Sequence, residues 1–186
     1  MFIKDKADAL FQMERLGLNH FPEIVCATDD MEGAKMFMQD NPAEEYCMRD
    51  PNGTVGKVFF PKTIEEIEEF AKEYDERFTL CVSANPYKED IVLLGDIKVN
   101  KDENMVDLTA RTDPEATHRN IYTEPEYNMH ISLDSDELWE VPGFSKLMAY
   151  ISNYELYDIV VEFVVYSARV GTNKENVVIF EIRSEY

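Results

Sequence analysis

Two apolar runs near the end of the chain constrain its fold more than any other feature. Residues 158–166, "DIVVEFVVY", and residues 176–185, "NVVIFEIRSE", have the length and the β-branched composition of buried strands. About nine residues, "SARVGTNKE", separate them and predict a hairpin. Each run contains a carboxylate, Glu162 or Glu181, and a charge buried in a sheet is costly unless it is paired or coordinated. The hairpin therefore predicts a partner for both carboxylates.

The alternation of side chains along each strand indicates what that partner is. Period two places Glu162 on one face of its strand, and places Glu181 and Arg183 on the same face as Ile179. If the two faces coincide, the carboxylates converge and repel each other. A Mg²⁺ ion would relieve that repulsion, because it takes one or two protein carboxylates together with phosphate oxygens. The alternatives are that one glutamate faces solvent, or that Glu181 pairs with Arg183.

The composition indicates an acidic, folded protein. The chain has 186 residues, of which 45% are hydrophobic, enough for one domain or for two small lobes. A net charge of −20 disfavours nucleic acid and anionic membranes as partners, and no apolar run approaches the roughly 18 residues of a membrane span. The N-terminus lacks the apolar region of a signal peptide, and Cys26, Cys47 and Cys81 are scattered. We therefore expect reduced thiols and a cytoplasmic location.

The rest of the chain mixes helical and strand patterns. The clearest helix covers residues 63–74, where Thr63 and Glu66 form a capping box ahead of an apolar stripe. The polar residues 112–136 predict a long loop. The other expected helices cover residues 7–17, 28–40 and 142–156, and the other expected strands cover residues 21–27, 44–49, 58–61, 78–84, 90–100 and 105–111.

A turn-rich loop at residues 50–57 is a candidate phosphate site. Gly53 and Gly56 lie between two strand patterns, and Arg49 and Lys57 flank them. Backbone amides in such a loop can hold phosphate while the basic side chains supply charge. The segment does not match a Walker loop, and an ordinary hairpin turn would have the same appearance.

Basic residues are concentrated in the polar stretch at residues 110–130. It holds Arg111, His118, Arg119 and His130 among acidic residues. The spacing of the histidines does not match a zinc site, and no cysteine is near them. Long loops in small domains are often functional, and basic residues in an acidic chain suit an anionic substrate; a solvated loop is the more common explanation of such a stretch.

Taken in chain order, six segments resemble ATP-grasp domains. The first begins with Asp-Lys at the start of a helix that ends in Gly. A strand that ends in a basic residue, a glycine loop and a second strand follow, and then an acidic helix and a hinge strand. The last two are strands with acids that bind Mg²⁺ in that family. The segments read "DKADALFQMERLGLNHFPE", "EEYCMRDPNGTVGKVFF", "EEIEEF", "FTLCVSANPYKEDIVLL", "VVEFVVY" and "VIFEIRS".

This resemblance implies an α+β fold in which two α+β lobes enclose a nucleotide cleft. It implies one ATP-grasp-like domain over residues 1–186, with one lobe at about residues 20–90 and the other formed by residues 1–19 with residues 91–186. The implied activity is that of an ATP- and Mg²⁺-dependent ligase or kinase that activates a small anionic substrate, most simply a carboxylate, by phosphoryl transfer.

The resemblance also implies roles for single residues. The protein backbone at residues 82–85 is expected to face adenine. The residues expected to bind ATP are Lys6, Arg49, Gly53, Gly56, Lys57, Ser83 and Asp90. Those expected to bind Mg²⁺ are Glu162 and Glu181, and those expected to act on the substrate are Arg111 and Arg183.

The sequence departs from the family pattern in ways that leave an alternative open. Arg49 stands where lysine is usual, and Arg183 stands where asparagine is usual. The usual N-terminal substrate domain is missing, so a second copy of the chain or a partner chain is expected to supply it. The alternative function is that of a degenerate, non-catalytic binding or scaffold protein, in which Arg183 takes the place of the metal ion.

Overall fold

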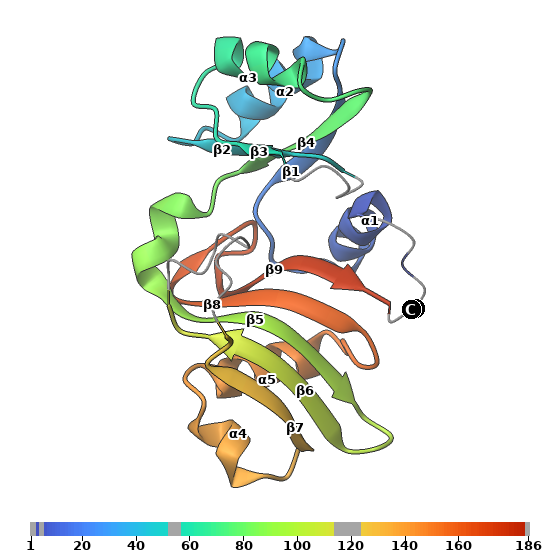
Figure 1. Cartoon of the computed structure of the whole chain (residues 1–186), viewed down its shortest axis with the longest axis vertical. Helices are drawn as coiled ribbons and strands as arrows, with labels where there is room; N and C mark the ends of the chain where they lie inside the picture. Colours follow the sequence, from blue (N-terminus) through green and yellow to red (C-terminus); the bar gives the residue numbers. More distant parts are fainter. Residues whose placement is uncertain (1–2, 4–5, 52–56, 114–123, 185–186) are drawn as a thin grey trace.

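A computed structural model describes the chain except for residues 1–2, 4–5, 52–56, 114–123 and 185–186. Its described part holds two antiparallel sheets, one of four strands and one of five. Figure 1 shows the sheets one above the other along the long axis of the molecule, each with helices of its own. The architecture is α+β, as predicted.

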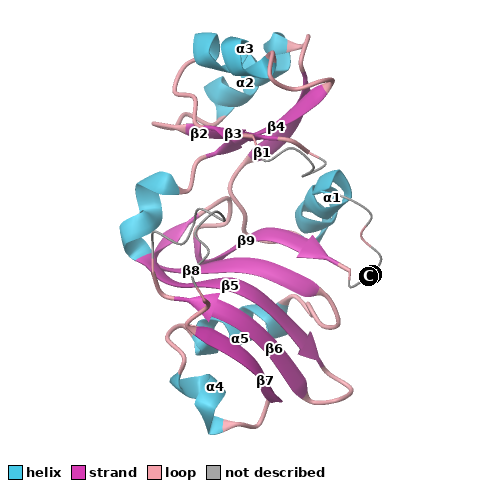
Figure 2. Cartoon of the chain, in the orientation of Figure 1, coloured by secondary structure: helices cyan, strands magenta, loops and turns pink. Residues whose placement is uncertain are grey.

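The smaller lobe is a sheet covered by two helices on the side away from the larger lobe (Figure 2). Its strand order is β1-β4-β2-β3. Ile67, Phe78 and Leu80 are fully buried between the sheet and the helices. The elements are β1 (Glu23–Ala27), α2 (Met31–Asp40), β2 (Tyr46–Arg49), β3 (Val58–Phe59), α3 (Ile64–Ala71) and β4 (Arg77–Val82). The predicted cap of α3 is confirmed, because the Glu66 amide donates to Thr63 Oγ1 at 3.3 Å.

The larger lobe is a sheet of order β7-β6-β5-β8-β9. Helix α5 covers its far face, where Phe144, Leu147 and Phe163 are buried, and α1 packs beside β9 on the side of the smaller lobe (Figure 1). The elements are α1 (Lys6–Leu16), the 3₁₀-helix η1 (Asn85–Asp90), β5 (Ile91–Asn100), β6 (Met105–Arg111), β7 (Tyr127–Ser132), α4 (Asp136–Glu140), α5 (Phe144–Asn153), β8 (Val160–Val170) and β9 (Glu175–Arg183).

Two sequence predictions about the larger lobe are wrong. Part of the expected loop at residues 112–136 is strand β7, because Tyr127, Met129 and Ile131 alternate with polar residues and pack against the main core. The closing hairpin also has a shorter turn than expected. Strand β8 continues to Val170 and β9 begins at Glu175, which leaves residues 171–174 between them.

A β-bulge in β9 explains how a glutamate fits inside an apolar run. Phe163 pairs with Ile179, but the preceding residue Glu162 pairs with Glu181, so Phe180 is the extra residue. A bulge turns the following side chains to the opposite face. Ile179 therefore packs into the core, while Glu181 lies on the other face of the sheet. The expectation that Ile179 and Glu181 share a face is wrong for this reason.

Gly95, in the middle of β5, allows β5 and β6 to approach closely. A Cβ atom there would lie 2.0 Å from the Thr109 carbonyl oxygen and 2.7 Å from Ala110 Cα. Both contacts are with backbone, which cannot move aside without separating the strands. We expect Gly95→Ala to lower the free energy of unfolding by roughly 3 kcal/mol or more, as for strong overpacking of a core. Urea denaturation measures this; Gly33→Ala, in α2 with no contact under 3.4 Å, is the control and should be neutral or slightly stabilising.

Candidate functional site

Polar side chains cross the face of the larger sheet that looks toward the smaller lobe. The register of three neighbouring strands places Asp96 of β5 opposite Glu162 of β8, and Glu162 opposite Glu181 of β9. Directly opposed residues on one face have Cβ atoms about 4.5–5.5 Å apart. Two carboxylates from β8 and β9 thus lie side by side on this face, next to a third that sequence reasoning missed.

Arg183 supplies positive charge to this row of carboxylates. It lies one step along β9 from Glu181 on the same face, opposite Val160. Its Nη2 donates a hydrogen bond to Asp96 Oδ1 at 3.0 Å, and its Nη1 lies 3.8 Å from Glu162 Oε2. The side chain is about two-fifths exposed, so it can still meet a ligand. Its main partner is therefore Asp96.

The carboxylates do not make a complete metal site by themselves. Within the described residues, no group of three or more His, Cys, Asp or Glu side chains is arranged to hold a metal. Glu162 and Glu181 nevertheless form an opposed pair of hard oxygen donors, and Mg²⁺ usually takes one or two carboxylates and completes its shell with phosphate and water. Asp96 keeps the Arg183 guanidinium occupied beside this pair.

Arg49, the predicted phosphate ligand on β2, forms a buried ion pair. Its Nη2 donates to both carboxylate oxygens of Glu23, at 2.8 and 2.9 Å. Burial disfavours the charge on the guanidinium, but the facing Glu23 carboxylate outweighs it and holds the pKa of Arg49 above its usual range. Arg49 Nε is buried and has no hydrogen-bond partner among the described residues. Arg49 thus points from the smaller sheet into the space between the lobes.

Arg49 and Glu181 meet across the two lobes. Both line a small cavity of about 10 Å³ that Phe180 and Glu23 also border, and residues of α1 close its side. A cavity of this size holds about one water molecule. The fold thus brings together a predicted phosphate ligand and a predicted metal ligand that lie far apart in the sequence.

The other predicted site residues lie in several places. The Lys57 ammonium is paired with Glu73 at 2.7 Å on the surface. Ser83 is buried and donates to Glu45 Oε1, whereas Asp90 accepts from Ser167 Oγ. Arg111 ends β6 on the same face as the carboxylates. Gly53, Gly56 and the side chain of Lys6 lie outside the described residues.

Aromatic side chains fill the hinge between the lobes. Phe21 stacks on Tyr87 with ring centroids 5.7 Å apart and meets Tyr166 and Phe180 edge-on. Val82 of the hinge strand packs against the same cluster. The Tyr166 hydroxyl is buried with no hydrogen-bond partner in the described part of the chain, and burial raises the pKa of Tyr166.

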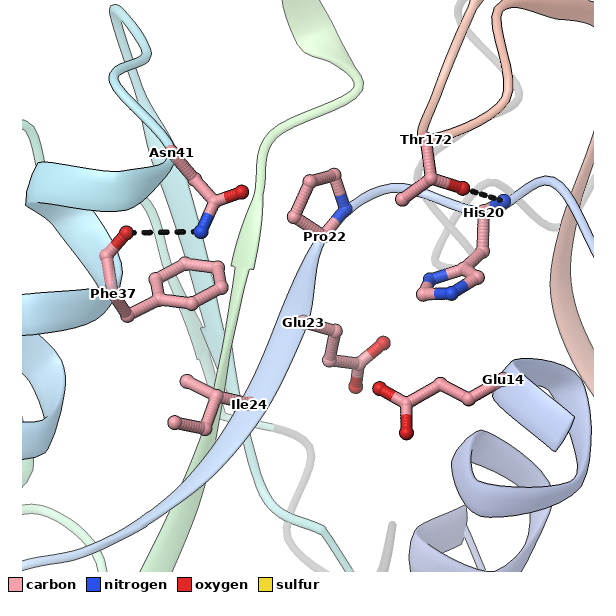
Figure 3. A pocket seen from close by; sticks show the side chains of 8 residues that line it. All are labelled: Glu14, His20, Pro22, Glu23, Ile24, Phe37, Asn41 and Thr172. Carbon is pink, nitrogen blue, oxygen red and sulfur yellow. Dashed lines mark hydrogen bonds between the residues drawn. The ribbon is translucent and has the colours of Figure 1, made fainter. Parts of the chain in front are cut away.

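A larger pocket lies beside the α1–β1 connection. Its volume is about 420 Å³, within the range of small-molecule sites. Figure 3 shows the Glu14 and Glu23 carboxylates pointing toward each other across it, with His20 and Thr172 nearby. This pocket could not be predicted from the sequence, because its lining residues come from a helix, a connection, a sheet and a hairpin turn that lie far apart in the chain. Its paired acids do not suit a phosphate group.

Comparisons with known proteins identify the fold. No family model and no curated protein matches the chain. Among solved structures, the chain resembles the D-alanine-D-alanine ligase of Helicobacter pylori with a TM-score of 0.55 and 15% identity, over 96% of this chain and 53% of that one. It also resembles N5-carboxyaminoimidazole synthase of Aspergillus clavatus in complex with ADP, with a TM-score of 0.58 and 12% identity, over 99% of this chain and 45% of that one.

The chain has an ATP-grasp fold. The predicted fold is thereby confirmed, and the chain spans about half the length of the enzymes it matches. The ATP-grasp fold accounts for the two stacked sheets. Among the described residues, no helix is long and apolar enough to cross a membrane.

Proposed function

We propose that this ATP-grasp protein binds ATP with Mg²⁺ between its two sheets and transfers a phosphoryl group to a small anionic substrate, most simply a carboxylate. The observation that carries the proposal is the meeting of Arg49 with Glu181 across the lobes, beside the opposed pair Glu162 and Glu181. A basic side chain facing two carboxylates is the charge pattern that a magnesium–phosphate group needs.

Each residue would act through charge and position. Arg49 would hold phosphate oxygens through its guanidinium, which carries positive charge into the space between the lobes. Glu162 and Glu181 would hold Mg²⁺, which when bound neutralises phosphate charge. Arg183, kept in place by Asp96, and Arg111 lie on the same face and would attract the anionic substrate. A second copy of the chain or a partner chain would add contacts to the acceptor.

Calorimetric titration with nucleotide tests the binding half of this proposal. We expect binding heat for ATP in the presence of Mg²⁺, much less for ATP with a chelator, and none for Mg²⁺ alone, because the two carboxylates depend on phosphate to complete the metal's coordination. If millimolar Mg-ATP produces no binding heat and no thermal shift, the proposal is wrong.

Trapping the activated substrate tests the chemical half. Phosphorylation of a carboxylate gives an acyl phosphate, which hydroxylamine converts to a stable hydroxamate. Incubation of the full chain with Mg-ATP, hydroxylamine and a panel of small carboxylates should give hydroxamate and ADP in equal amounts for the true substrate class. ADP without hydroxamate would indicate a different phosphoryl acceptor.

A second function is favoured by the position of Arg183. Its guanidinium lies between Asp96 and Glu162 and partly neutralises the row of carboxylates without a metal ion. In that case the chain would be a non-catalytic binding or scaffold protein that keeps the ATP-grasp fold. It predicts that Mg²⁺ has no effect on any nucleotide binding, which the same titration measures.

A further inference from the structure

Two cysteines lie opposite each other on the smaller sheet. Cys47 of β2 pairs with Cys81 of β4, and Cys81 pairs in turn with Glu23 of β1. All three alternate with the residues that pack under α2 and α3, so they lie on the face that looks toward the larger lobe. Both thiols are free and partly exposed. Cys26, by contrast, is buried in the core on the opposite face.

The spacing of antiparallel partners suits a covalent bond between the two sulfurs. Directly paired residues have Cα atoms about 4.5–5.5 Å apart, depending on their hydrogen-bonding position. Disulfides span Cα separations of about 4.4–6.8 Å. Cys47 and Cys81 can therefore be joined while β2 and β4 stay paired, whereas Cys26 on the other face cannot reach either of them.

Neighbouring charges distinguish the two thiols, because Arg49 lies two residues along β2 from Cys47 on the same face, whereas Glu23 of β1 lies directly opposite Cys81. The Cys81 thiol donates a hydrogen bond to the Cys47 sulfur, and this bond, helped by the Arg49 guanidinium, lowers the pKa of Cys47. Burial and the carboxylates of Glu23 and Glu45 oppose that shift and are outweighed. The same hydrogen bond and burial raise the pKa of Cys81 well above its usual value. Burial also raises the pKa of Cys26, to about 11.

We propose that Cys47 and Cys81 are a reversible disulfide-forming site on the cleft face of the smaller sheet, with Cys47 as the attacking thiol. With hydrogen peroxide, the Cys47 thiolate takes one oxygen to become a sulfenic acid and the other oxygen leaves as water after protonation. The Cys81 thiol then attacks the Cys47 sulfur, a second water leaves, and the disulfide forms. With oxidised glutathione, the Cys47 thiolate attacks one sulfur to form a mixed disulfide and releases one glutathione thiolate. The Cys81 thiol then attacks the Cys47 sulfur, and the second glutathione leaves in its reduced form.

Thiol counting on the full chain tests this site. The reduced protein is exposed to oxidised glutathione, blocked with N-ethylmaleimide under denaturing conditions, and weighed intact. Before blocking, we expect a monomeric product that is lighter than the reduced chain by two hydrogen atoms. After blocking, it should carry a single maleimide, which peptide mapping places on Cys26. Treatment with dithiothreitol should restore uptake at all three cysteines.

Single serine variants separate this proposal from general thiol oxidation. Cys81→Ser should stop at a stable glutathione adduct on Cys47. In Cys47→Ser, we expect Cys81 to react with oxidised glutathione at least about 10-fold more slowly than Cys47 does in Cys81→Ser, which is the rate change that one unit in pKa gives. Cys26→Ser is the control and should form the disulfide at the wild-type rate. A disulfide that includes Cys26, a dimeric product, or equal reactivity of Cys47 and Cys81 in the two variants would overturn the proposal.

Discussion

Replacing Glu181 by Gln is expected to abolish the magnesium-dependent part of nucleotide binding. The amide keeps the size of the side chain but removes the charge, and an amide oxygen is a poorer ligand for Mg²⁺ than a carboxylate. We expect affinity for Mg-ATP to fall at least about 10-fold, the lower end of what loss of a supporting group costs a metal site. Binding of ATP in the presence of a chelator should change little. Calorimetry under both conditions measures the difference.

Matched variants make this result specific. Glu140→Gln removes a carboxylate of the same kind from an exposed position in α4, on the far side of the larger lobe, and should bind Mg-ATP like wild type. Glu162→Gln should resemble Glu181→Gln, because the two carboxylates form one opposed pair. Wild-type Mg-ATP affinity in both Glu162→Gln and Glu181→Gln would show that these residues do not bind the metal.

The position of Asp96 gives the scaffold alternative a different signature. If Arg183 is the permanent cation of the row, its main contact is the hydrogen bond to Asp96. Glu181→Gln would leave that contact in place, so we expect Mg-ATP to change the stability of wild type and of the variant by the same amount. Urea denaturation with and without Mg-ATP thus separates the two functions, because in the proposed enzyme Mg-ATP stabilises wild type more than Glu181→Gln.

Local signals in the sequence predicted most of the elements that position this site. The capping box at Thr63, the apolar stripe of α3 and the β-branched closing strands depend on neighbours in the chain, so they can be read without the structure. The opposed glutamates followed from the same strands. The face of the sheet on which Glu181 lies could not be predicted, because it depends on a bulge at Phe180, and no local residue preference marks that position.

Contacts between distant segments were beyond sequence reasoning, with one exception. Asp96 could have been found, since it alternates with Lys98 and Asn100 along β5 as one polar face of a half-buried strand. Phe21 could not, because an aromatic residue in a connection gives no sign that it will enter a hinge cluster with Tyr166. Strand β7 was not predicted, because the polar residues on one of its faces made the segment resemble a loop.

Asn19 to Ala is expected to be one of the most destabilising changes in the chain. Asn19 is fully buried in the α1–β1 connection, where its Nδ2 donates to the carbonyl oxygens of Val170 and Val177 at 3.0 and 2.7 Å. Its Oδ1 accepts from the Asn173 amide at 2.8 Å. Alanine would leave two buried carbonyl groups without partners, so we expect a loss of roughly 2–4 kcal/mol in the free energy of unfolding. Urea denaturation measures it, and Asn153→Ala, exposed at the end of α5, should change it by less than about 0.5 kcal/mol.

Gly171 makes the role of Asn19 separable from a general loss of packing. Gly171 has φ +80°, and a Cβ there would lie 2.5 Å from Asn19 Oδ1. Gly171→Ala therefore brings two costs: backbone strain, which is independent of Asn19, and a collision, which needs Asn19 in place. In a double-mutant cycle, Gly171→Ala should cost at least about 1 kcal/mol less in the Asn19→Ala background than in wild type. Equal costs in both backgrounds would mean that Asn19 does not hold the turn of the hairpin that carries Glu162 and Glu181.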